Sequence, residues 1–315
     1  ELRYCISCMN CFNVNPFSYE QTNCSVNPFA LREGSKRPLM VNGAGRVVAI
    51  VGAGPAGMEA AVTLKQRGFD VVVFDKRDEI GGNLHVAKKP PFKGKFEWAI
   101  DYYKSMAKKL NITMKLGKEV TAQEVLALKP YSILVATGSN VISIPLEGLD
   151  QVQTVQAHDV LVNDMQFANK KVVVIGGGIT GLETALYINR QGTNQVSVVD
   201  MLPEWPVDML DMRYQNEALL EVRHCNDQGV ALFYNNKVVK FADGKLFIES
   251  TKDGEVKELP ADVIVLSVGV KPNDALWQEL LASGHPSVWK AGDAIATGKI
   301  NKAVLHGSKF GYSLN

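Results

Sequence analysis

The sequence predicts an α/β fold in which two doubly wound, Rossmann-like domains follow an irregular N-terminal segment. Two observations predict the domains: a strand, a Gly-x-Gly-x-x-Gly turn, a helix and a second strand occur at residues 46–76, and the same order recurs at 170–201. A third concerns the start of the chain, where four of the five cysteines fall within the first 24 residues. The repeated unit indicates two nucleotide sites in one chain.

The composition restricts the class of protein. A chain of 315 residues suggests two domains at roughly 100–200 residues each. The net charge of +1 comes without a basic block, so we expect no nucleic-acid partner. The apolar runs are too short to span a bilayer, and the clustered cysteines do not resemble a disulfide framework. We therefore expect a cytoplasmic protein without a membrane partner. Because the chain begins at Glu1, we also expect that it has been processed, cut or trimmed.

The elements of the first unit follow from local pattern. Residues 1–34 are irregular and 33–45 read as a linker. A buried strand, a helix closed by Gly68 and a second strand then follow, at 46–54, 55–68 and 70–76. A later strand at 131–139 completes the unit.

The second unit repeats this order. Its strand, helix and strand are expected at 170–178, 179–192 and 195–201, with Gly192 ending the helix. Residues 231–258 alternate in polarity around turns at 242–245 and 252–255, which predicts an antiparallel ribbon. A strand at 261–273 closes the second unit, and a short strand at 288–294 and a helix from about Asn301 follow it.

The glycines of each turn have separate tasks. Gly52 permits the tight turn out of the strand, Gly54 lets the backbone approach a pyrophosphate, and Gly57 lets the helix pack on the sheet. Asp75 ends the next strand, where a carboxylate binds a ribose hydroxyl. A glycine turn without a ligand is the alternative for a single match, but two matches in the required context make that alternative weak.

The second turn carries Gly176, Gly178 and Gly181, with Asp200 as its acid. No Lys or Arg follows in residues 201–204, and the Asp200 carboxylate would repel a 2′-phosphate. If this is the nicotinamide site, NADH is preferred over NADPH.

Two dinucleotides in one chain predict hydride transfer from a nicotinamide to a flavin. This reaction depends on stacking and alignment more than on a side-chain acid or base, so we name no catalytic side chain. His85 and His306 are the tempting candidates, and a structural hydrogen-bonding role is the expected one for both. The absence of a Cys-x4-Cys pair beside either glycine turn argues against a disulfide reductase of the glutathione reductase kind.

The cysteine cluster predicts a metal centre. Cys5, Cys8 and Cys11 open a ferredoxin-like run, and Cys24 completes four ligands. A [4Fe–4S] cluster is the favoured interpretation, because four-cysteine zinc sites usually consist of two separated pairs and not of three close cysteines and a remote one. Zinc, whose sites also use Cys-x2-Cys, and no metal remain the alternatives. Cys225 stands alone on an expected helix as a structural or surface thiol.

Several of these motifs together resemble a known family. The cysteine run, the first glycine motif and the stretch around Gly82 are similar to the C-terminal half of the iron–sulfur flavoenzymes of the old yellow enzyme type, the group of 2,4-dienoyl-CoA reductase, enoate reductase and trimethylamine dehydrogenase. The resemblance covers nearly the whole chain. In that family, electrons run from NAD(P)H to FAD, to the cluster, to FMN on a TIM barrel, and to substrate.

The resemblance implies site residues. The cluster ligands would be the four N-terminal cysteines. The FAD side would comprise Gly52, Gly54, Pro55, Ala56, Gly57, Asp75, Lys76, Gly82, Asn83, Leu84, Val120, Ala136, Thr137, Gly138, Gly269, Gly292, Asp293, Ala303 and Val304. Within this set, Asp293 would meet the ribityl or pyrophosphate region, and Ala303 and Val304 would offer helix N-terminal backbone to the flavin ring. The NADH side would comprise Gly176, Gly178, Ile179, Thr180, Gly181 and Asp200.

The resemblance also implies an architecture. The cluster segment would be residues 1–45, the FAD domain 46–140 with 263–315, and the inserted NAD domain 141–262. The chain departs from the family because it has no barrel and hence no FMN site or enoyl-substrate site. The barrel is therefore expected to have been cut off or to be a separate chain, in an oligomeric assembly, unless this module serves a different acceptor.

The function expected from the resemblance is an NADH-dependent flavin and iron–sulfur reductase module that feeds an FMN domain acting on an enoate-type substrate. A free-standing NADH oxidase or diaphorase and a non-catalytic nucleotide-binding scaffold are the alternatives. The cluster segment should face the missing partner with an apolar patch, for which Phe12, Phe17 and Phe29 are candidates. Local core is the alternative role for these rings.

Overall fold

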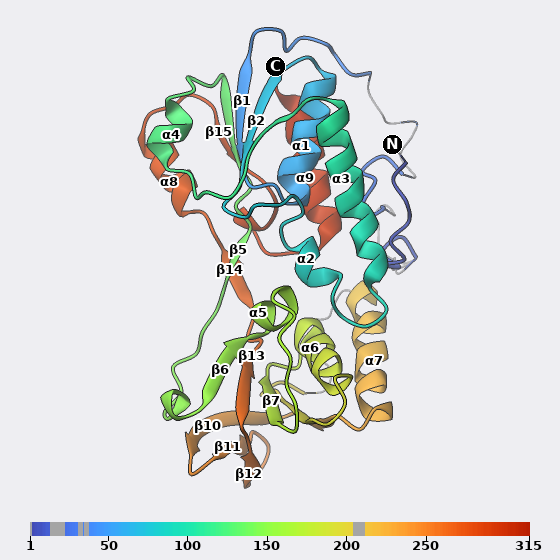
Figure 1. The fold of residues 1–315 in the computed structure, drawn as a ribbon, viewed down its shortest axis with the longest axis vertical. Coiled ribbons are helices and arrows are strands. Elements are labelled where there is room, and N and C mark those ends of the chain that lie inside the picture. Colours follow the sequence, from blue (N-terminus) through green and yellow to red (C-terminus); the bar gives the residue numbers. More distant parts are fainter. Residues whose placement is uncertain (1, 13–22, 31–33, 35–37, 204–211) are drawn as a thin grey trace.

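A computed structural model describes residues 2–12, 23–30, 34, 38–203 and 212–315. The chain forms two lobes, which Figure 1 shows one above the other. The N-terminal segment lies along one side of the upper lobe, and the C-terminus also lies in that lobe. Within the described residues, no helix is long and apolar enough to cross a membrane.

The upper lobe is built on a parallel sheet. Its strand order is β15-β4-β1-β2-β3, with β1 (Val47–Val51), β2 (Asp70–Phe74), β3 (Thr113–Lys115), β4 (Ser132–Val135) and β15 (Val288–Lys290). The central strands β1, β2 and β4 are short apolar runs that are mostly buried, as parallel strands covered on both faces require, whereas the edge strands β3 and β15 are more exposed.

Helices cover both faces of this sheet (Figure 1). One layer contains α1, α3 and α9, which share a core with Ile50, Val73 and Leu134. The opposite layer packs around Leu280 of α8 and Val125 of α4. The helices of this lobe are α1 (Pro55–Gln66), α2 (Leu84–Ala87), η2 (Gly94–Phe96), α3 (Glu97–Lys109), α4 (Ala122–Leu126), α8 (Ala275–Ala282), η4 (Gly292–Ala294) and α9 (Ile300–Ser313).

The lower lobe repeats the parallel sheet but covers it differently. Its strand order is β6-β13-β7-β8-β9, with β6 (Gln153–Gln156), β7 (Lys171–Ile175), β8 (Gln195–Val199), β9 (Ala231–Phe233) and β13 (Val263–Leu266). One face packs against α5 (Ala157–Val162), α6 (Ile179–Asn189) and α7 (Met212–Asp227).

The other face of the lower sheet packs against an antiparallel ribbon. The ribbon consists of β10 (Asn236–Ala242), β11 (Lys245–Ser250) and β12 (Val256–Pro260), and the short helix η3 (Leu149–Gln151) lies beside β10. Phe241, Leu246 and Ile248 of the ribbon are buried against the sheet.

Two strands connect the lobes. β5 (Ser139–Val141) leaves the upper lobe and β14 (Val270–Pro272) returns to it, and the two pair antiparallel. Figure 1 shows this pair spanning the gap between the lobes. The lower lobe is therefore inserted between two parts of the upper lobe.

The structure differs from the sequence-based expectation at two places. The strand at 263–266 lies between β6 and β7 in the lower sheet, so it closes the second unit as expected, but the expected domain boundary at 263 is placed too early because it assigns this strand to the FAD unit. Residues 231–233 pair in parallel with β8, so the antiparallel ribbon begins only at Asn236. Both strands have the apolar character of a buried sheet, and their pairing depends on distant neighbours.

Candidate functional site

The first glycine turn connects β1 to α1 with little free space. Gly52 has φ 115°, and a Cβ there would lie 2.1 Å from the carbonyl oxygen of Ala136. A Cβ on Gly57 would lie 1.9 Å from the carbonyl oxygen of Gly52. At Gly54, in contrast, a Cβ would have only the Cα of Gly82 nearby, at 3.8 Å. Two glycines thus close the turn, and the third leaves an open approach.

The second turn reproduces this geometry in the lower lobe. Gly176 has φ 111°, and its Cβ would lie 2.2 Å from the Ser267 carbonyl oxygen. A Cβ on Gly181 would lie 1.9 Å from the Gly176 carbonyl oxygen, whereas nothing lies within 4 Å of the missing Cβ of Gly178. The two turns are therefore equivalent in structure as well as in sequence.

The two acids also occupy equivalent places. Asp75 Oδ2 accepts the amide of Ala53 at 2.6 Å, and Asp200 Oδ2 accepts the amide of Gly177 at 2.6 Å. The other carboxylate oxygen of each acid accepts an amide two residues further on, from Arg77 and Leu202 respectively. Each carboxylate is thus fixed at the end of its strand beside the glycine turn, where a ribose hydroxyl is expected.

Both helices present open amides at these turns. Gly54 is the N-cap of α1 and Gly178 is the N-cap of α6, and no side chain caps either helix. Pro55 opens α1 without a donor of its own, so Ala56 and Gly57 supply the amides. In α6 the donors are Ile179, Thr180 and Gly181. Uncapped amides and the helix dipole favour an anion here, so both turns fit the pyrophosphate of a dinucleotide.

A second loop approaches the first turn. The Gly81 amide donates to the Ala53 carbonyl at 2.9 Å, and a Cβ on Gly82 would lie 2.8 Å from the Cα of Gly54. Arg77 donates to the Gly82 carbonyl at 2.8 Å. The structure therefore brings Gly82 to the glycine turn as expected, and adds Gly81 and Arg77, which sequence reasoning did not single out.

Two later segments meet the same turn. Thr137 Oγ1 donates to the Asn273 carbonyl at 2.5 Å, and Gly138, with φ 75°, accepts the Asn273 amide. A Cβ on Gly292 would lie 3.0 Å from that of Ala56, so this glycine lies against the first turn of α1.

Asp293 lies next to this contact. It accepts the Gly298 amide at 3.1 Å and the Ser139 hydroxyl at 3.4 Å. Burial raises the pKa of its carboxyl. An acceptor at this position suits a hydroxyl or amide donor of the expected flavin.

Helix α9 begins at Ile300, close to the expected Asn301, but its open amides are not the implied ones. Its N-cap is Lys299, whose carbonyl accepts the amides of Lys302 and Ala303. Because Ala303 and Val304 lie inside the helix, the open amides of its first turn are those of Ile300 and Asn301. The side chain of Val304 is buried in the core.

Several other residues that the resemblance implies as cofactor contacts are buried in the core, exposed to solvent or located between the lobes. Leu84 packs in an apolar cluster with Ile6 and Phe96, and Val120 belongs to the core around Phe74. Lys76 and Asn83 are exposed. Gly269 accepts the Ile142 amide in the connection between the lobes. Contacts from Leu84 and Val120 to a flavin would have to come from their backbone.

The two histidines have unlike surroundings. His85 is buried, its Nε2 lies 2.9 Å from the Ile80 carbonyl, and its Nδ1 lies 3.3 Å from Glu79. This matches a structural role. His306 on α9 is half-buried, and burial together with nearby lysines lowers its pKa.

Cys225 is fully buried in α7, and burial raises the pKa of its thiol to about 12. It is therefore a structural thiol.

The four N-terminal cysteines have the chemistry of a cluster site but not its arrangement. Cys5 and Cys11 are exposed, while Cys8 and Cys24 are half-buried beside Ile6 and Val26. The Ser7 amide donates to Cys5 Sγ at 3.4 Å. Within the described part of the chain, however, no three His, Cys, Asp or Glu side chains form a group that could hold a metal ion. The predicted ligand set is therefore not assembled in this structure.

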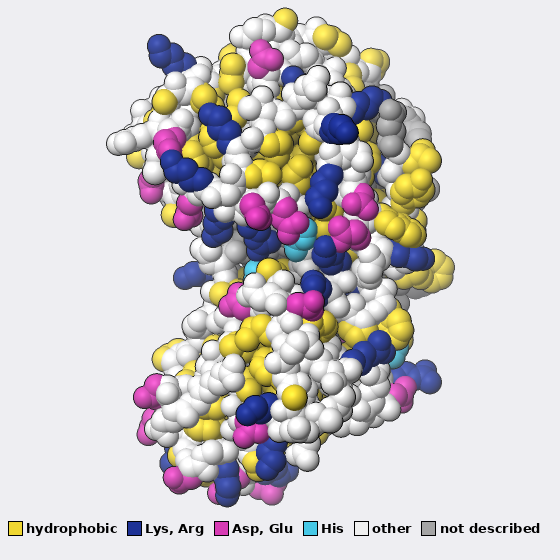
Figure 2. All heavy atoms as spheres, viewed as in Figure 1, with side chains coloured by type: hydrophobic (Ala, Val, Ile, Leu, Met, Phe, Trp, Pro, Cys, Tyr) yellow, Lys and Arg dark blue, Asp and Glu magenta, His cyan; other side chains and the backbone are white. Residues whose placement is uncertain are grey.

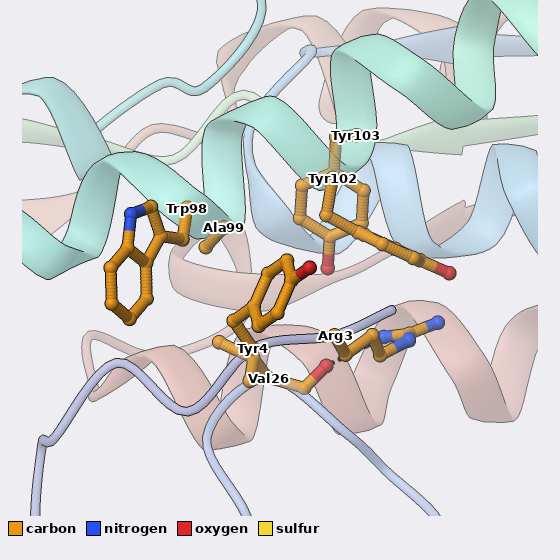
Figure 3. Close-up of a pocket in the computed structure, with 7 residues that line it drawn as sticks. All are labelled: Arg3, Tyr4, Val26, Trp98, Ala99, Tyr102 and Tyr103. Carbon is orange, nitrogen blue, oxygen red and sulfur yellow. Dashed lines mark hydrogen bonds between the residues drawn. The ribbon is translucent and has the colours of Figure 1, made fainter. Parts of the chain in front are cut away.

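The cysteine segment is fixed to the upper lobe by a buried ion pair. Arg3 donates to both oxygens of Glu59, at 2.7 and 2.9 Å, and to the Val26 carbonyl. Glu59 is 1% exposed and also accepts the Tyr103 hydroxyl. Figure 3 shows Arg3 and Tyr4 facing Trp98 and the two tyrosines of α3 around a cavity of about 10 Å³. That space suits about one water and no substrate.

Further contacts bring this segment to the N-terminal end of α9. Asn301 donates to the side chain of Asn23, which directly precedes Cys24, at 3.1 Å. Lys95 Nζ lies 3.2 Å from the hydroxyl of Ser7. Phe12 is exposed, and Phe29 packs edge-on against Tyr312, so Phe12 fits the expected patch and Phe29 fits local core. Phe17 lies outside the described residues.

Comparison with known proteins gives a family match over the part of the chain that contains both glycine turns. Residues 46–304 match the family model of the pyridine nucleotide-disulphide oxidoreductases. An NADH oxidase from Thermoanaerobacter brockii is 32% identical over all of this chain and 48% of its own length. A cinnamate reductase from Clostridium sporogenes is 29% identical over 89% of this chain and 41% of its own length.

A solved 2-naphthoyl-CoA reductase complex superimposes with a TM-score of 0.83 and 29% identity, over 93% of this chain and 44% of the other. The chain thus spans about half the length of these relatives or less.

Proposed function

Because this chain belongs to the pyridine nucleotide-disulphide oxidoreductase family, and is an NAD(P)H-dependent flavin oxidoreductase, we propose that it is the reductase module of a larger cytoplasmic enzyme. NADH would reduce FAD on this chain, and the electrons would pass by way of the cysteine segment to an FMN-binding TIM-barrel domain or subunit that reduces an enoate-type substrate. The paired glycine turns are the observation that carries this proposal.

The roles of the upper lobe follow from its contacts. The amides of Ala56 and Gly57 bind the FAD pyrophosphate, and Asp75 binds the adenosine ribose. The backbone around Gly82 and Gly292 lies against the same turn and positions the rest of the cofactor. Bound FAD supplies the redox chemistry, accepting a hydride and releasing electrons.

The lower lobe binds the nicotinamide coenzyme. The open amides of α6 bind its pyrophosphate, and Asp200 binds the ribose. NADH is favoured because the Asp200 carboxylate would meet the 2′-phosphate of NADPH without a nearby cation in residues 201–203.

The partner and the cluster rest on the N-terminal segment. The cysteine spacing supports a [4Fe–4S] cluster held by Cys5, Cys8, Cys11 and Cys24. Apolar side chains on and beside the segment are exposed, by 77% for Phe12, and these form the proposed docking face: Leu2, Tyr4, Met9, Phe12 and Trp98. The chain's share of its relatives' length leaves room for a barrel domain, and the cinnamate and naphthoyl-CoA reductases support an enoate-type substrate.

A free-standing NADH oxidase is the second candidate. It is favoured by the name of the Thermoanaerobacter relative, although that protein is twice as long. Turnover of NADH in air by the isolated chain would favour this candidate. A scaffold without catalysis would bind nucleotide and carry no flavin.

The deciding experiment is an anaerobic titration of the purified chain with NADH, and with NADPH as the comparison, while the visible spectrum is recorded. Bleaching of flavin bands near ~450 nm together with a broad fall near ~400 nm is expected, and iron and sulfide analysis should give a cluster that is lost in Cys8→Ser. A spectrum without flavin, or one that NADH leaves unchanged, would refute the reductase. Flavin without iron would refute the cluster alone.

A further inference from the structure

Charged side chains from both lobes meet at the waist of the molecule (Figure 2). Lys93, in the loop between α2 and η2 of the upper lobe, pairs with Glu183 of α6 and lies 3.0 Å from Glu217 of α7. Lys299 of the upper lobe pairs with the other oxygen of Glu217. We call these four residues the ionic latch.

The latch joins the nucleotide-binding helix α6 of the lower lobe to the beginning of α9 in the upper lobe. Glu183 lies two residues after Gly181, in the first turns of α6. Lys299 is the N-cap of α9, whose N-terminal backbone the family resemblance places beside the flavin ring. A chain of three ion pairs therefore connects the pyrophosphate end of α6 to the beginning of α9.

The position of the latch complements the covalent connection. The chain passes between the lobes only at β5 and β14 in the part that the structure describes, and Figure 1 places these strands on the side away from α7. A two-stranded connection permits rotation of one lobe against the other. Contacts on the α7 side would restrict that rotation.

Neighbouring contacts reinforce the latch. Lys89 lies 3.3 Å from Asp164 of the lower lobe, and Arg77 lies 3.1 Å from Nε2 of His158. The Arg190 guanidinium stacks on the Phe92 ring, 4.5 Å from its centre. The loop that carries Lys93 is thus held to the lower lobe along its length.

The central ion pair of the latch is largely shielded from solvent, so it can contribute more to holding the lobes together than an exposed pair can. The side chain of Glu183 is 8% exposed and that of Lys93 is 18% exposed. Removing one charge from such a pair leaves its partner buried without compensation. Exposed pairs such as Lys245–Glu258, at 2.6 Å within the ribbon, contribute little.

We propose that Lys93 is a positioning residue, and that the ionic latch holds the lower lobe in the orientation in which a nicotinamide on α6 reaches a flavin beside α9. The part that concerns hydride transfer rests on the proposed function. The mechanical part, restraint of the lobes, stands independently of it.

The test compares Lys93→Gln, Lys93→Arg and the control Lys245→Gln in the flavin-loaded protein. Hydrogen–deuterium exchange should become faster at residues 88–96 and at the beginning of α6 in Lys93→Gln, and stay unchanged in β10–β12. Stopped-flow reduction of the flavin at saturating NADH should slow about tenfold, with NADH affinity kept within about twofold. Lys93→Arg should retain most of both properties, and the control should match the parent.

Lys299→Gln removes the outer pair and serves as a second variant if Lys93→Gln does not fold. Parental exchange in both Gln variants would overturn the latch. Faster exchange with an unchanged reduction rate would overturn the positioning role. If the parent itself is not reduced by NADH, the proposed function fails, while the exchange data still decide the latch.

Discussion

At the residue scale, the two halves use the same positions for the same tasks. Gly57 and Gly181 are closed in by a carbonyl oxygen, whereas Gly54 and Gly178 face open space. Glu59 and Glu183 also correspond, each two residues after the third glycine. Both carboxylates are buried, and each forms an ion pair with a side chain from outside its own βαβ unit: Glu59 with Arg3, and Glu183 with Lys93.

Substitutions at two glycines of the second turn should therefore have different effects, one on coenzyme binding and the other on stability. A methyl group on Gly178 has space, and the backbone there has φ −70°, so Gly178→Ala should leave the melting temperature within about 2 °C while weakening NADH binding at least ~tenfold by obstructing the pyrophosphate. Gly181→Ala should lower the stability by about 1–3 kcal/mol, because its Cβ would overlap the Gly176 carbonyl. Calorimetry and NADH titration measure the two effects. Equal loss of stability in both variants would contradict the assignment of tasks.

At the element scale, the contact between α1 and α9 fixes the flavin side of the molecule. A Cβ on Gly307 would lie 2.1 Å from the Ala56 carbonyl oxygen, and one on Gly311 would lie 2.6 Å from the side chain of Thr63. The two glycines are one turn apart on α9, so the helix backbones approach closely. Because Ala56 is proposed to supply an amide to the pyrophosphate, we expect the packing of α9 to affect that site.

Gly307→Ala should separate these helices. We expect a loss of about 1–3 kcal/mol in the free energy of unfolding, together with release of flavin, because the added methyl displaces the first turn of α1. Lys302→Ala, at an exposed position of the same helix, is the matched control and should change neither. Denaturant titration and the flavin-to-protein absorbance ratio are the measurements. Full flavin content in Gly307→Ala would contradict this prediction, because it would show that α1 and α9 can accommodate the methyl group without disturbing the flavin site.

At the scale of the whole molecule, a buried carboxyl makes the folding free energy depend on pH. Burial raises the pKa of Glu183 to about 7, against the opposing effect of Lys93 and with the support of Glu221 and Glu217. The same group titrates near 4.5 when unfolded. Between these values the folded chain holds the proton more tightly, so this group's contribution to stability falls as pH rises and is at its lowest above pH 7.

Glu183→Gln should remove that dependence. In the parent, the free energy of unfolding should decline from pH 5 to pH 7.5 by up to about 3 kcal/mol relative to Glu183→Gln. Urea denaturation at several pH values measures the difference. Glu258→Gln, an exposed partner in the ribbon, is the control and should run parallel to the parent. A constant difference between parent and Glu183→Gln across this range would refute the assigned titration.

Local sequence pattern was sufficient to identify the strand–turn–helix units and the residues of both glycine turns. The turns can be recognised in the sequence for two reasons. Glycine is the residue type that tolerates φ near 110° with a carbonyl oxygen close to its Cα, and the acid follows at the end of the next strand. The helices expected at 55–68 and 179–192 from their periodicity and closing glycines are present at 55–66 and 179–189. These features depend on residues close together in the chain.

Only the tertiary structure decided what depends on distant neighbours. Three examples are the pairing of Ala231–Phe233 with β8 instead of with the ribbon, the burial of Leu84 beneath the cysteine segment and the latch at Lys93. Each joins residues that the sequence keeps far apart. An apolar strand has no preference for one of two similar sheets until its partners are present, and a lysine in a loop does not reveal the carboxylate that it will meet. Packing and charge pairing across the lobes supplied that information.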